Sequence, residues 1–285
     1  MQVAFETNPK SFLEKYGPYL ERNEAEHNLI LSLCQLAEQR LARGEKADIR
    51  FATLSNDDGL VMATVQTPPS NLVLSRATQP EIEQLAETLA VQNYAFPGIV
   101  GPSDVAASFA EKWAEKTGQQ SVEYMDQIIY SLTKVTFPPP IDGALRPAKA
   151  GEEELVKKWM MAFAADALPK AEQLTADEAL KRATDLIKAG RVYVWDVGGR
   201  PRAQAAVSGT SKAARLNMVY TPPEERGHGY ASAVVAGLTQ LQLDSGKKMC
   251  CLYADARNSV SNSIYRKIGY EFVGRSSLYV LGKKA

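Results

Sequence analysis

The stretch from Asn217 to Leu241 constrains this chain most, because it joins an apolar strand to a helix through a glycine-rich loop. The strand ends at Pro222 and Pro223, which favour a turn. Residues 226–231 then place two glycines and several backbone N–H groups at a helix start. These groups lack partners inside the helix and the helix dipole adds positive charge, so the loop predicts a pyrophosphate-binding site. The helix itself is indicated by apolar residues with a period near 3.6 at Ala231, Val234, Val235, Leu238 and Leu241.

The spacing within this loop separates it from two other phosphate-binding loops. It does not follow the G-x-G-x-x-G pattern of dinucleotide folds, and no Gly-Lys-Ser/Thr follows as in a P-loop. The pattern present is R-x-x-G-x-A, formed by Arg226, Gly229 and Ala231. This pattern resembles the coenzyme A loop of the GNAT acyltransferase superfamily.

A second signature lies downstream, in the order and at about the distance that the same superfamily shows. It consists of Asn258, a small residue after it, and Tyr265 before the pair Gly269-Tyr270. The resemblance is closest to the C-terminal domain of glycine N-acyltransferase-like proteins and covers residues 143–281. It implies an α+β fold with a mixed α/β sheet flanked by helices, and acyl transfer from an acyl-CoA.

Length and charge narrow the remaining classes of protein. A chain of 285 residues is comfortable for two domains of ordinary size. Lysine plus arginine number 33, as do aspartate plus glutamate, so no net field attracts nucleic acid or an anionic membrane. No apolar run approaches the roughly 20 residues of a membrane span, and the N-terminus has neither a basic start nor an apolar signal core. We therefore expect no nucleic acid and no membrane among the partners.

Cysteine and histidine content predicts the compartment and the metal requirement. The cysteines are an odd number, Cys34, Cys250 and Cys251, and two of them are adjacent in an apolar strand whose alternation points them to opposite faces. This favours reduced thiols and a cytoplasmic location. The chain has only two histidines, and one of them, His228, lies inside the glycine loop, so no metal is expected.

The first half of the chain is predicted to alternate helices and strands. Pro18 is expected to divide a helical region into two helices, and residues 56–59 (Asn-Asp-Asp-Gly) are typical of a hairpin turn. Pro80 and Glu81 suit the first turn of a further helix. The expected helices cover 11–43, 78–91 and 104–116, and the expected strands cover 49–54, 60–65, 71–74, 99–100 and 127–135.

This order of elements resembles a GNAT domain, but the segment after residues 71–74 has no glycine to bring the backbone close to a phosphate. Two interpretations remain, namely a degenerate GNAT-like copy without a coenzyme A loop and a different α+β domain. Resemblance to two-domain bacterial GNAT proteins favours the degenerate copy. We therefore predict tandem acyl-CoA N-acyltransferase-like domains: a degenerate one over 1–135, a proline-rich linker over 136–142 and a catalytic one over 143–285.

The second half is predicted to form a mixed sheet flanked by helices. Thr175 and Glu178 have the spacing of a capping box at a helix start, and residues 197–200 join two strands as a hairpin. The expected helices cover 152–168, 175–188 and 258–267, besides the helix after the glycine loop. The expected strands cover 143–148, 191–196, 202–209, 215–221, 247–253 and 271–280.

The resemblance implies roles for individual residues. In the superfamily, the strand before the loop separates from its neighbour, and its backbone holds the pantetheine arm and the acyl carbonyl; an ordinary paired strand is the alternative here. The Val219 N–H is the candidate donor to the oxyanion. Arg226 can pair with phosphate or lie on the surface, and His228 is expected to point to solvent. The matching strand residues are Met218, Val219, Tyr220 and Thr221, and the loop residues are Arg226, Gly227, His228, Gly229, Tyr230 and Ala231.

Two residues of the second signature have both a chemical and a structural interpretation. Tyr265 matches the tyrosine that protonates the coenzyme A thiolate, and an ordinary phenol pKa near 10 keeps it protonated at neutral pH. Its alternative is a core residue. Asn258 can hydrogen-bond the pantetheine arm, but its position also suits a helix N-cap, which needs no ligand.

No residue is assigned as the general base. Many superfamily members carry a glutamate on the strand before the loop, where this chain has Asn217, so a water chain is the default. Glu224 and Glu225 are expected to be solvated charges. Cys250 and Cys251 have no basic partner nearby in the sequence, so buried thiols are favoured over a nucleophile.

The sequence thus predicts an N-acetyltransferase that uses acetyl-CoA, or another short acyl-CoA, as cosubstrate. Transfer is expected to be direct, to a primary amine of a small molecule or amino acid, with Tyr265 as general acid. Two alternatives remain: a non-catalytic acyl-CoA-binding sensor or scaffold, and an acetyltransferase acting on lysines of a partner protein.

Overall fold

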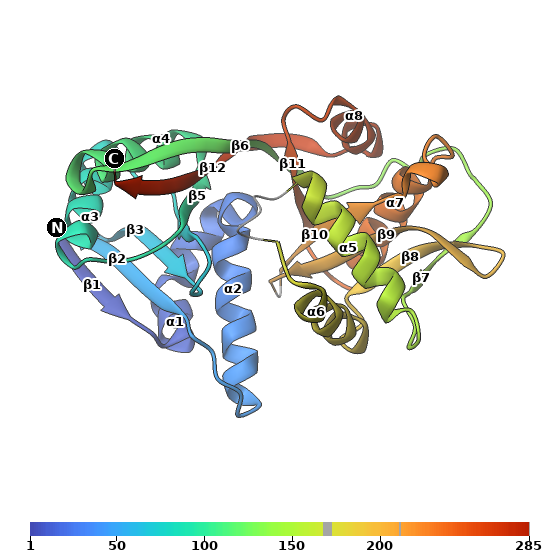
Figure 1. The fold of residues 1–285 in the computed structure, drawn as a ribbon, viewed down its shortest axis with the longest axis horizontal. Coiled ribbons are helices and arrows are strands. Elements are labelled where there is room, and N and C mark those ends of the chain that lie inside the picture. The colour runs from blue at the N-terminus through green and yellow to red at the C-terminus, as the bar shows by residue number, and fades with distance from the viewer. Residues whose placement is uncertain (168–172, 211, 285) are drawn as a thin grey trace. The chain divides into compact units, whose positions relative to one another are not determined.

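The computed structural model describes residues 1–167, 173–210 and 212–284 (Figure 1). It separates into two compact units, of which the first contains Met1–Ile129 with Val273–Ala285 and the second contains Tyr130–Phe272. The C-terminal segment therefore belongs to the first unit, whereas the boundaries predicted from the sequence assign it to the second. None of the described helices combines the length and the apolar character that crossing a bilayer requires.

The first unit is built on a sheet with strands in both orientations. Neighbours from β1 to β4 are antiparallel, β4 and β5 are parallel, and β12 pairs antiparallel with β5. In spatial order the strands are β1 (Gln2–Glu6), β2 (Arg50–Asn56), β3 (Gly59–Gln66), β4 (Leu72–Leu74), β5 (Gly98–Pro102), β12 (Glu271–Lys284) and β6 (Gln119–Leu132).

Helices cover both faces of this sheet because successive strand residues point to opposite sides. Phe51 belongs to an apolar cluster with Phe12 of the first helix, whereas its neighbour Ala52 belongs to a separate cluster with Leu85 and Phe109. The helices are α1 (Pro9–Leu20), α2 (Glu24–Ala42), α3 (Gln79–Val91) and α4 (Ser103–Thr117).

The second unit has a similar mixed sheet. Neighbours from β7 to β10 are antiparallel, and β10 and β11 are parallel. In spatial order the strands are β7 (Ala144–Pro147), β8 (Val192–Val197), β9 (Arg200–Gly209), β10 (Ala213–Tyr220) and β11 (Met249–Asp255). The helices are α5 (Glu153–Ala167), α6 (Ala176–Lys188), α7 (Tyr230–Asp244) and α8 (Ser259–Ile268).

The two faces of this second sheet meet different helices. Val194 and Ala206 belong to the apolar core formed with α5 and α6, and their side of the sheet is named the α5/α6 face. On β11, the Cys250 thiol donates to the Thr239 carbonyl of α7 at 3.7 Å, so the opposite side is named the α7 face. Figure 1 shows these two groups of helices around strands β7 to β11.

The same order of elements occurs twice along the chain: a strand, two helices, three strands, a helix, a strand, a helix and a strand. The predicted first half lacked β1 (Gln2–Glu6). This short strand at the edge of the sheet has no buried residue, so it lacks the alternation that marks a half-buried strand. With β1 included, the set β1 to β6 is repeated by the set β7 to β12.

The last strand of the second repeat completes the sheet of the first unit. β12 pairs with β5 from Ser276↔Pro102 to Val280↔Gly98. The Ser277 hydroxyl also donates to the Glu123 carboxylate of β6 at 2.7 Å. The end of β6, from Tyr130 onward, belongs in turn to the second unit, where β6 is the neighbour of β11. The two repeats therefore exchange their last strands.

Two expectations about the first half are wrong in detail. Pro18 lies inside α1 and does not end it; the break is a 3₁₀ turn at Glu21–Asn23. A proline in the last turn of a short helix removes only one backbone hydrogen bond, which α1 tolerates. β6 begins at Gln119, whereas the sequence predicts a start near residue 127. The first residues of β6 are largely polar and are exposed or half-buried, so they lack the apolar alternation that indicates a strand.

The expected elements of the second half agree with the observed ones to within a few residues. The capping box at Thr175 is present, since Glu178 accepts from the Thr175 N–H at 2.9 Å. The expected end of α5 at residue 168 lies outside the described residues. The proline-rich segment 136–142 lies inside the second unit, where Trp195 donates to the Asp142 carbonyl at 2.9 Å.

Candidate functional site

Strand β10 leaves its neighbour β11 before either strand ends. Their parallel pairing runs from Ala213↔Met249 to Leu216↔Leu252 and stops there, although both strands continue within the described residues. Against β9, the register of β10 shifts between Asn217 and Tyr220. Met218 lies in this bulge with a φ of +49°, a conformation that costs a non-glycine residue about 1–2 kcal/mol. The second half of β10 is therefore free of β11 pairing. The superfamily resemblance predicts this separation for Met218 to Thr221, of which Thr221 follows the end of the strand.

The loop after β10 needs its glycines for backbone reasons. After a 3₁₀ turn at Pro223–Glu225, Gly227 and Gly229 have φ angles of +84° and +83°. A Cβ atom built on Gly227 would meet no atom within 4 Å, and one on Gly229 would only touch Ile141 at 3.7 Å. Space does not exclude a side chain at either position, so the left-handed backbone is what selects glycine here.

Helix α7 starts without a side-chain cap. Its N-cap is Gly229, no side chain bonds to the first turn, and the first turn has no acidic residue. The first backbone bond into the helix runs from the Ala233 N–H to the Gly229 carbonyl at 3.0 Å. Helix geometry leaves the N–H groups of residues 230–232 without intrahelical acceptors. Donors and positive dipole together make this helix start suited to an anion.

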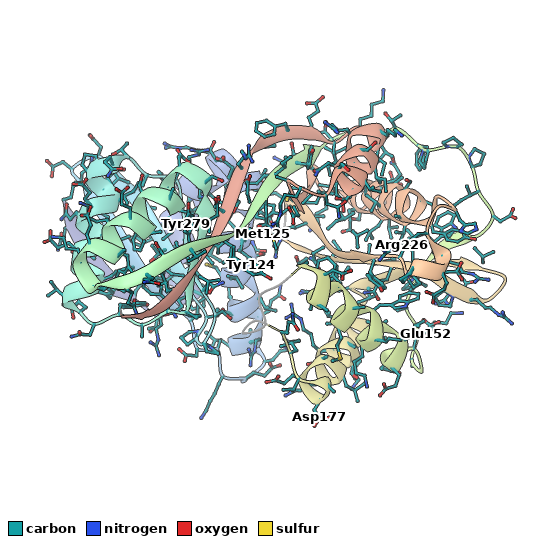
Figure 2. All side chains as sticks on the ribbon, turned by 45° about the horizontal axis from the view of Figure 1, so that its top comes forward. Tyr124, Met125, Glu152, Asp177, Arg226 and Tyr279 are labelled. Carbon is teal, nitrogen blue, oxygen red and sulfur yellow. The ribbon has the colours of Figure 1, made fainter. Side chains whose placement is uncertain are left out.

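The side chains of the loop have distinct surroundings. Arg226, labelled in Figure 2, is exposed, and its Nε donates to the Thr221 carbonyl at 3.1 Å. His228 is exposed as expected; its Nδ1 lies 3.3 Å from the Glu225 carbonyl oxygen, and its ring stacks on Tyr230 with 5.5 Å between centroids. Arg226 lies in the loop that leads to this helix start, and its exposed side chain is accessible to a ligand.

Two acidic residues in the turn were expected to be solvated, and one of them is not. Glu224 is exposed. Glu225 is half-buried and forms an ion pair with Arg202 of β9. This pairing fixes the turn to the sheet and occupies the Glu225 carboxylate, which makes it a poor general base.

Thr221 has a feature that the sequence did not reveal. Its hydroxyl oxygen is buried and has no hydrogen-bond partner among the described residues. Buried hydroxyl groups in folded proteins are nearly always hydrogen-bonded, so such an atom at the mouth of the loop fits a ligand contact. Thr221 directly follows β10, which places this hydroxyl between the open strand end and the loop.

Tyr265 of α8 is buried among aromatic rings. Its ring centroid lies 6.2 Å from that of Tyr130 and 6.1 Å from that of Tyr270. Burial, and to a lesser degree the neighbouring Tyr130, raises the pKa of Tyr265 to about 12. The phenol therefore stays protonated at all physiological pH values, as a proton donor must.

The remaining predicted site residues have structural partners. Asn258 is the N-cap of α8, where its side chain accepts from the Ser261 N–H at 3.0 Å. Asn217 donates to the Ser208 hydroxyl at 3.0 Å. Both of the adjacent cysteines are buried thiols outside any disulfide, and burial raises the pKa of Cys250 to about 12. These thiols are unsuited to act as nucleophiles, in agreement with the sequence-based expectation.

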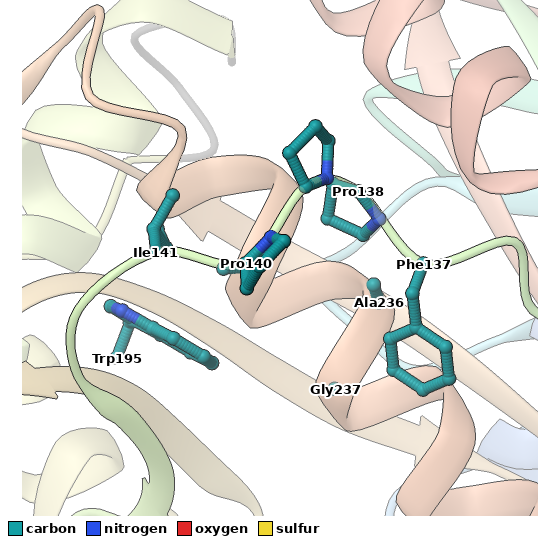
Figure 3. A pocket seen from close by; sticks show the side chains of 9 residues that line it. Phe137, Pro138, Pro140, Ile141, Trp195, Ala236 and Gly237 are labelled. Atoms are coloured by element: carbon teal, nitrogen blue, oxygen red, sulfur yellow. The ribbon is translucent and has the colours of Figure 1, made fainter.

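The proline-rich segment packs over α7. It lines an apolar cavity of about 390 Å³ together with Trp195 of β8 and the small residues Ala233, Ala236 and Gly237 of α7 (Figure 3). At one end of the segment, the Thr136 N–H donates to the Ile268 carbonyl at 2.8 Å. The segment is therefore part of the wall behind α7, on the side of the sheet away from α5 and α6.

One family model matches the part of the chain that contains this site. Residues 198–280 match the model of the FR47-like protein family, and this range contains β10, the glycine loop, α7 and α8. No curated protein matches the chain.

Solved structures share the whole architecture at low sequence identity. A Drosophila protein is 12% identical with a TM-score of 0.70, and the match covers 98% of either chain. A GNAT-family acetyltransferase from Colwellia psychrerythraea is 13% identical with a TM-score of 0.57, covering 99% of this chain and 100% of the other. A tandem GNAT protein from the clavulanic acid biosynthesis pathway is 11% identical with a TM-score of 0.55, covering 100% and 99%. The chain thus has the tandem GNAT fold, and the predicted fold class is confirmed.

Proposed function

We propose that the second unit binds acetyl-CoA, or another short acyl-CoA, and transfers its acyl group to a primary amine. The observation that best supports this proposal is that two features follow each other in the chain. β10 leaves β11 at the Met218 bulge, and the start of α7 that follows has no side-chain cap and no acidic residue in its first turn. The first feature opens a slot beside backbone groups, and the second supplies donors for a pyrophosphate. Neither feature alone specifies a thioester, but the FR47-like match spans both.

Residues of the loop fit the phosphate end of this cosubstrate. The backbone from Gly227 to Ala231 presents N–H groups at the positive end of α7. Arg226 is exposed beside them and adds a charged donor. The unpartnered Thr221 hydroxyl lies at the end of β10, where the pantetheine arm would enter. All of these contacts are made by groups that the fold already holds in place.

The proposed reaction uses the backbone of β10 together with Tyr265. The amine nitrogen attacks the thioester carbonyl carbon, so a C–N bond forms and the carbonyl oxygen becomes an oxyanion, which the Val219 N–H stabilises. The C–S bond then breaks, and the leaving thiolate takes the phenolic proton of Tyr265. The nitrogen loses a proton to water, and a proton from water restores the phenol. The products are an amide and free coenzyme A.

No side chain near β10 is required as a base in this scheme. Asn217 stands where a carboxylate would serve, and its amide already donates to Ser208. Glu225 is held by Arg202. An acceptor amine that loses its first proton to bulk water before binding needs only a water path for the second. A sensor that binds acyl-CoA without turnover is the competing function, and the missing base is the observation that favours it.

Ligand-dependent unfolding tests the binding step. A ligand at about 100 times its dissociation constant stabilises the folded state by about 2.7 kcal/mol. We expect acetyl-CoA and free coenzyme A to raise the unfolding temperature of the wild-type protein. The Arg226→Ala variant should show a smaller rise, and Arg200→Gln, an exposed arginine at the β8–β9 turn, serves as control. No rise with the wild-type protein would overturn the assignment.

Turnover separates the enzyme from the sensor. Thiol release from acetyl-CoA is followed over a panel of primary amines. Tyr265→Phe should lower kcat by a hundredfold or more while acetyl-CoA binding stays intact. Because the Tyr265 pKa lies near 12, this acid should cause no fall in rate with rising pH up to about pH 10. Unchanged kcat in Tyr265→Phe contradicts the role of Tyr265, and binding without turnover for every amine supports the sensor.

A further inference from the structure

Strand register brings a charged residue to the α5/α6 face close to the open end of β10. Asn217 pairs with Ala206, a residue of the core formed with α5 and α6. Arg215 precedes Asn217 by two residues, so its side chain points to the same face. Ser208 is its partner on β9. The Ser208 hydroxyl accepts from the Asn217 amide and donates to the Arg215 carbonyl, and it accepts no hydrogen bond from the guanidinium.

The Arg215 guanidinium has no carboxylate partner among the described residues. Its Nε is buried and makes no hydrogen bond there. The guanidinium carbon lies 5.9 Å from the ring centroid of Tyr253 on β11, a cation–π contact. Tyr253 lies beyond the last β10–β11 pair, where the two strands have separated. An arginine donor held in this way is costly unless another group accepts its hydrogen bonds.

A second arginine belongs to a helix on the same face of the sheet. Arg182 of α6 flanks the buried stripe formed by Ala179, Ala183 and Ile187. Desolvation lowers the pKa of Arg182, and the charge of Arg215 lowers it further. Part of the Arg182 side chain remains exposed, so solvent and small ligands can reach it. Two cations on one face of the sheet repel each other, and a bound anion would offset this repulsion.

We propose that the acceptor amine carries an anionic group, a carboxylate in the first instance, which Arg215 and Arg182 bind. This inference rests on the proposed acyl transfer and names the substrate class of the same site. The planar guanidinium fork matches a carboxylate or a phosphate. The amine at the other end of a short molecule then lies toward the open half of β10, where the acyl carbonyl is held. An α- or β-amino acid has this layout.

The anion is assigned to the acceptor and not to coenzyme A because the two sites lie on different sides of the sheet. The phosphates belong at the start of α7, the helix that covers the α7 face. Arg215 and Arg182 belong to the α5/α6 face. The acceptor must approach the thioester from the side that the cosubstrate leaves open, and this arginine pair lies on that side.

Binding measurements on matched ligands test the proposal without relying on turnover. Amino acids, their uncharged amides, and phosphoethanolamine with ethanolamine are titrated by calorimetry, with and without saturating coenzyme A. The wild-type protein is compared with Arg215→Gln, Arg215→Lys and Arg182→Gln, and Arg200→Gln is the control. Thermal unfolding with coenzyme A shows whether each variant folds and keeps its cosubstrate site.

We expect at least one anionic amine to bind wild-type protein ten- to a hundredfold more tightly than its neutral counterpart, the usual range for a charge-assisted hydrogen bond. Arg215→Gln should remove this difference, Arg215→Lys should retain part of it, and Arg182→Gln should reduce it. The coenzyme A effect should stay unchanged in all of them. A preference for phosphoethanolamine over amino acids would identify phosphate as the bound anion.

Three outcomes would overturn the proposal: equal binding of acids and amides, equal binding by Arg215→Gln and Arg200→Gln, or no anionic amine bound by the wild-type protein. Failure of the proposed function has a different signature. In that case coenzyme A has no effect on unfolding, whereas the titrations without coenzyme A still report on the arginine pair.

Discussion

The starts of α3 and α7 occupy the same place in the two repeats, and they differ in what satisfies their N–H groups. Each helix follows a strand that pairs in parallel with the next one, β4 with β5 and β10 with β11. α3 begins with a capping box, in which Glu81 accepts from the Thr78 N–H and Thr78 caps the N3 backbone. α7 begins at Gly229 with neither cap nor acid. In the first unit, the Glu81 carboxylate thus occupies the position at the start of α3 where an anion would otherwise bind.

The segment between strand and helix differs in the same way. In the first unit, the Ser75 hydroxyl accepts from the Ala63 N–H at 2.9 Å, and the Ser75 N–H donates to the Ala63 carbonyl at 2.9 Å. Arg76 next to it is held by Glu26 and Asp104. In the second unit, β10 leaves its neighbour and Thr221 keeps an unpartnered hydroxyl. At this segment, one copy of the fold satisfies its polar groups internally, and the other leaves the Thr221 hydroxyl and the start of α7 available for the ligand that we propose.

The largest effect is expected from removing residues 273–285. Their loss strips β5 of its partner β12 and exposes the core behind Leu278, so the first unit should lose at least about 3 kcal/mol of stability. Hydrogen exchange of β5 amides, compared with β8 amides of the second unit, measures this loss. Unchanged protection of β5 would show that β12 is dispensable for the first unit.

The next effect comes from copying the first unit's acid into the second. Ser232 occupies the N3 position of α7, which Glu81 occupies in α3. Ser232→Glu should favour the helix dipole yet weaken acetyl-CoA binding by roughly a hundredfold, because two negative charges then share the helix start. Ser232→Gln is the matched neutral control and should bind within a few-fold of wild type. Calorimetry that finds the two variants equal would refute the anion site at α7.

The reverse change, which removes the acid from the first unit, should have a modest effect on the stability of that unit. Glu81→Ala removes half of the capping box and should cost the first unit about 0.5–1 kcal/mol. It should not create acyl-CoA binding there, because Ser75 and Arg76 still occupy the loop. Chemical denaturation measures the cost, and titration of a variant that also carries Ser232→Glu reports on binding by the first unit alone. Binding by that double variant would show that one carboxylate is all that separates the two copies.

A smaller, pH-dependent effect is expected at His27 in the first unit. Its Nδ1 donates to the Leu20 carbonyl at 2.9 Å, and its Nε2 accepts from the Arg76 N–H at 3.1 Å. Burial, the largest cause, lowers the His27 pKa below 6.5, while Glu26 opposes and Arg76 adds to this shift. The unfolded chain then binds more protons, so stability should fall as pH drops below about 6.5 and level off below the lowered pKa. His27→Gln should flatten this dependence between pH 7 and 5, and an unchanged slope would assign it to other groups.

Local sequence patterns predict much of the fold. The capping box at Thr175, the hairpin over residues 56–59 and the period of α7 all depend on residues within one turn or one element of each other. For the same reason, the glycines at 227 and 229 could be recognised by spacing alone. The order of elements between Arg226 and Tyr265 also follows from the sequence, because its periodicity predicts a helix, a strand and a second helix there.

Other features depend on contacts between segments far apart in the chain, and no local pattern encodes them. The pairing of β12 with β5 joins residues near 278 to residues near 100, and no local signal distinguishes this from pairing within its own repeat. The bulge at Met218 exists only relative to the register of β9. The ion pair of Glu225 with Arg202 likewise needs the turn to fold back onto the sheet.

By itself, the sequence determined the glycine loop, the helix that it opens and the absence of such a loop in the first half. Spacing and backbone preference are properties of neighbouring residues, so these three features can be predicted without a structure. Only the tertiary structure decided that Arg215 and the helix that carries Arg182 belong to one face of the sheet, and that β10 separates from β11 just after Arg215. These arrangements arise from strand register and helix packing, in which residues distant in the chain compete for the same partners.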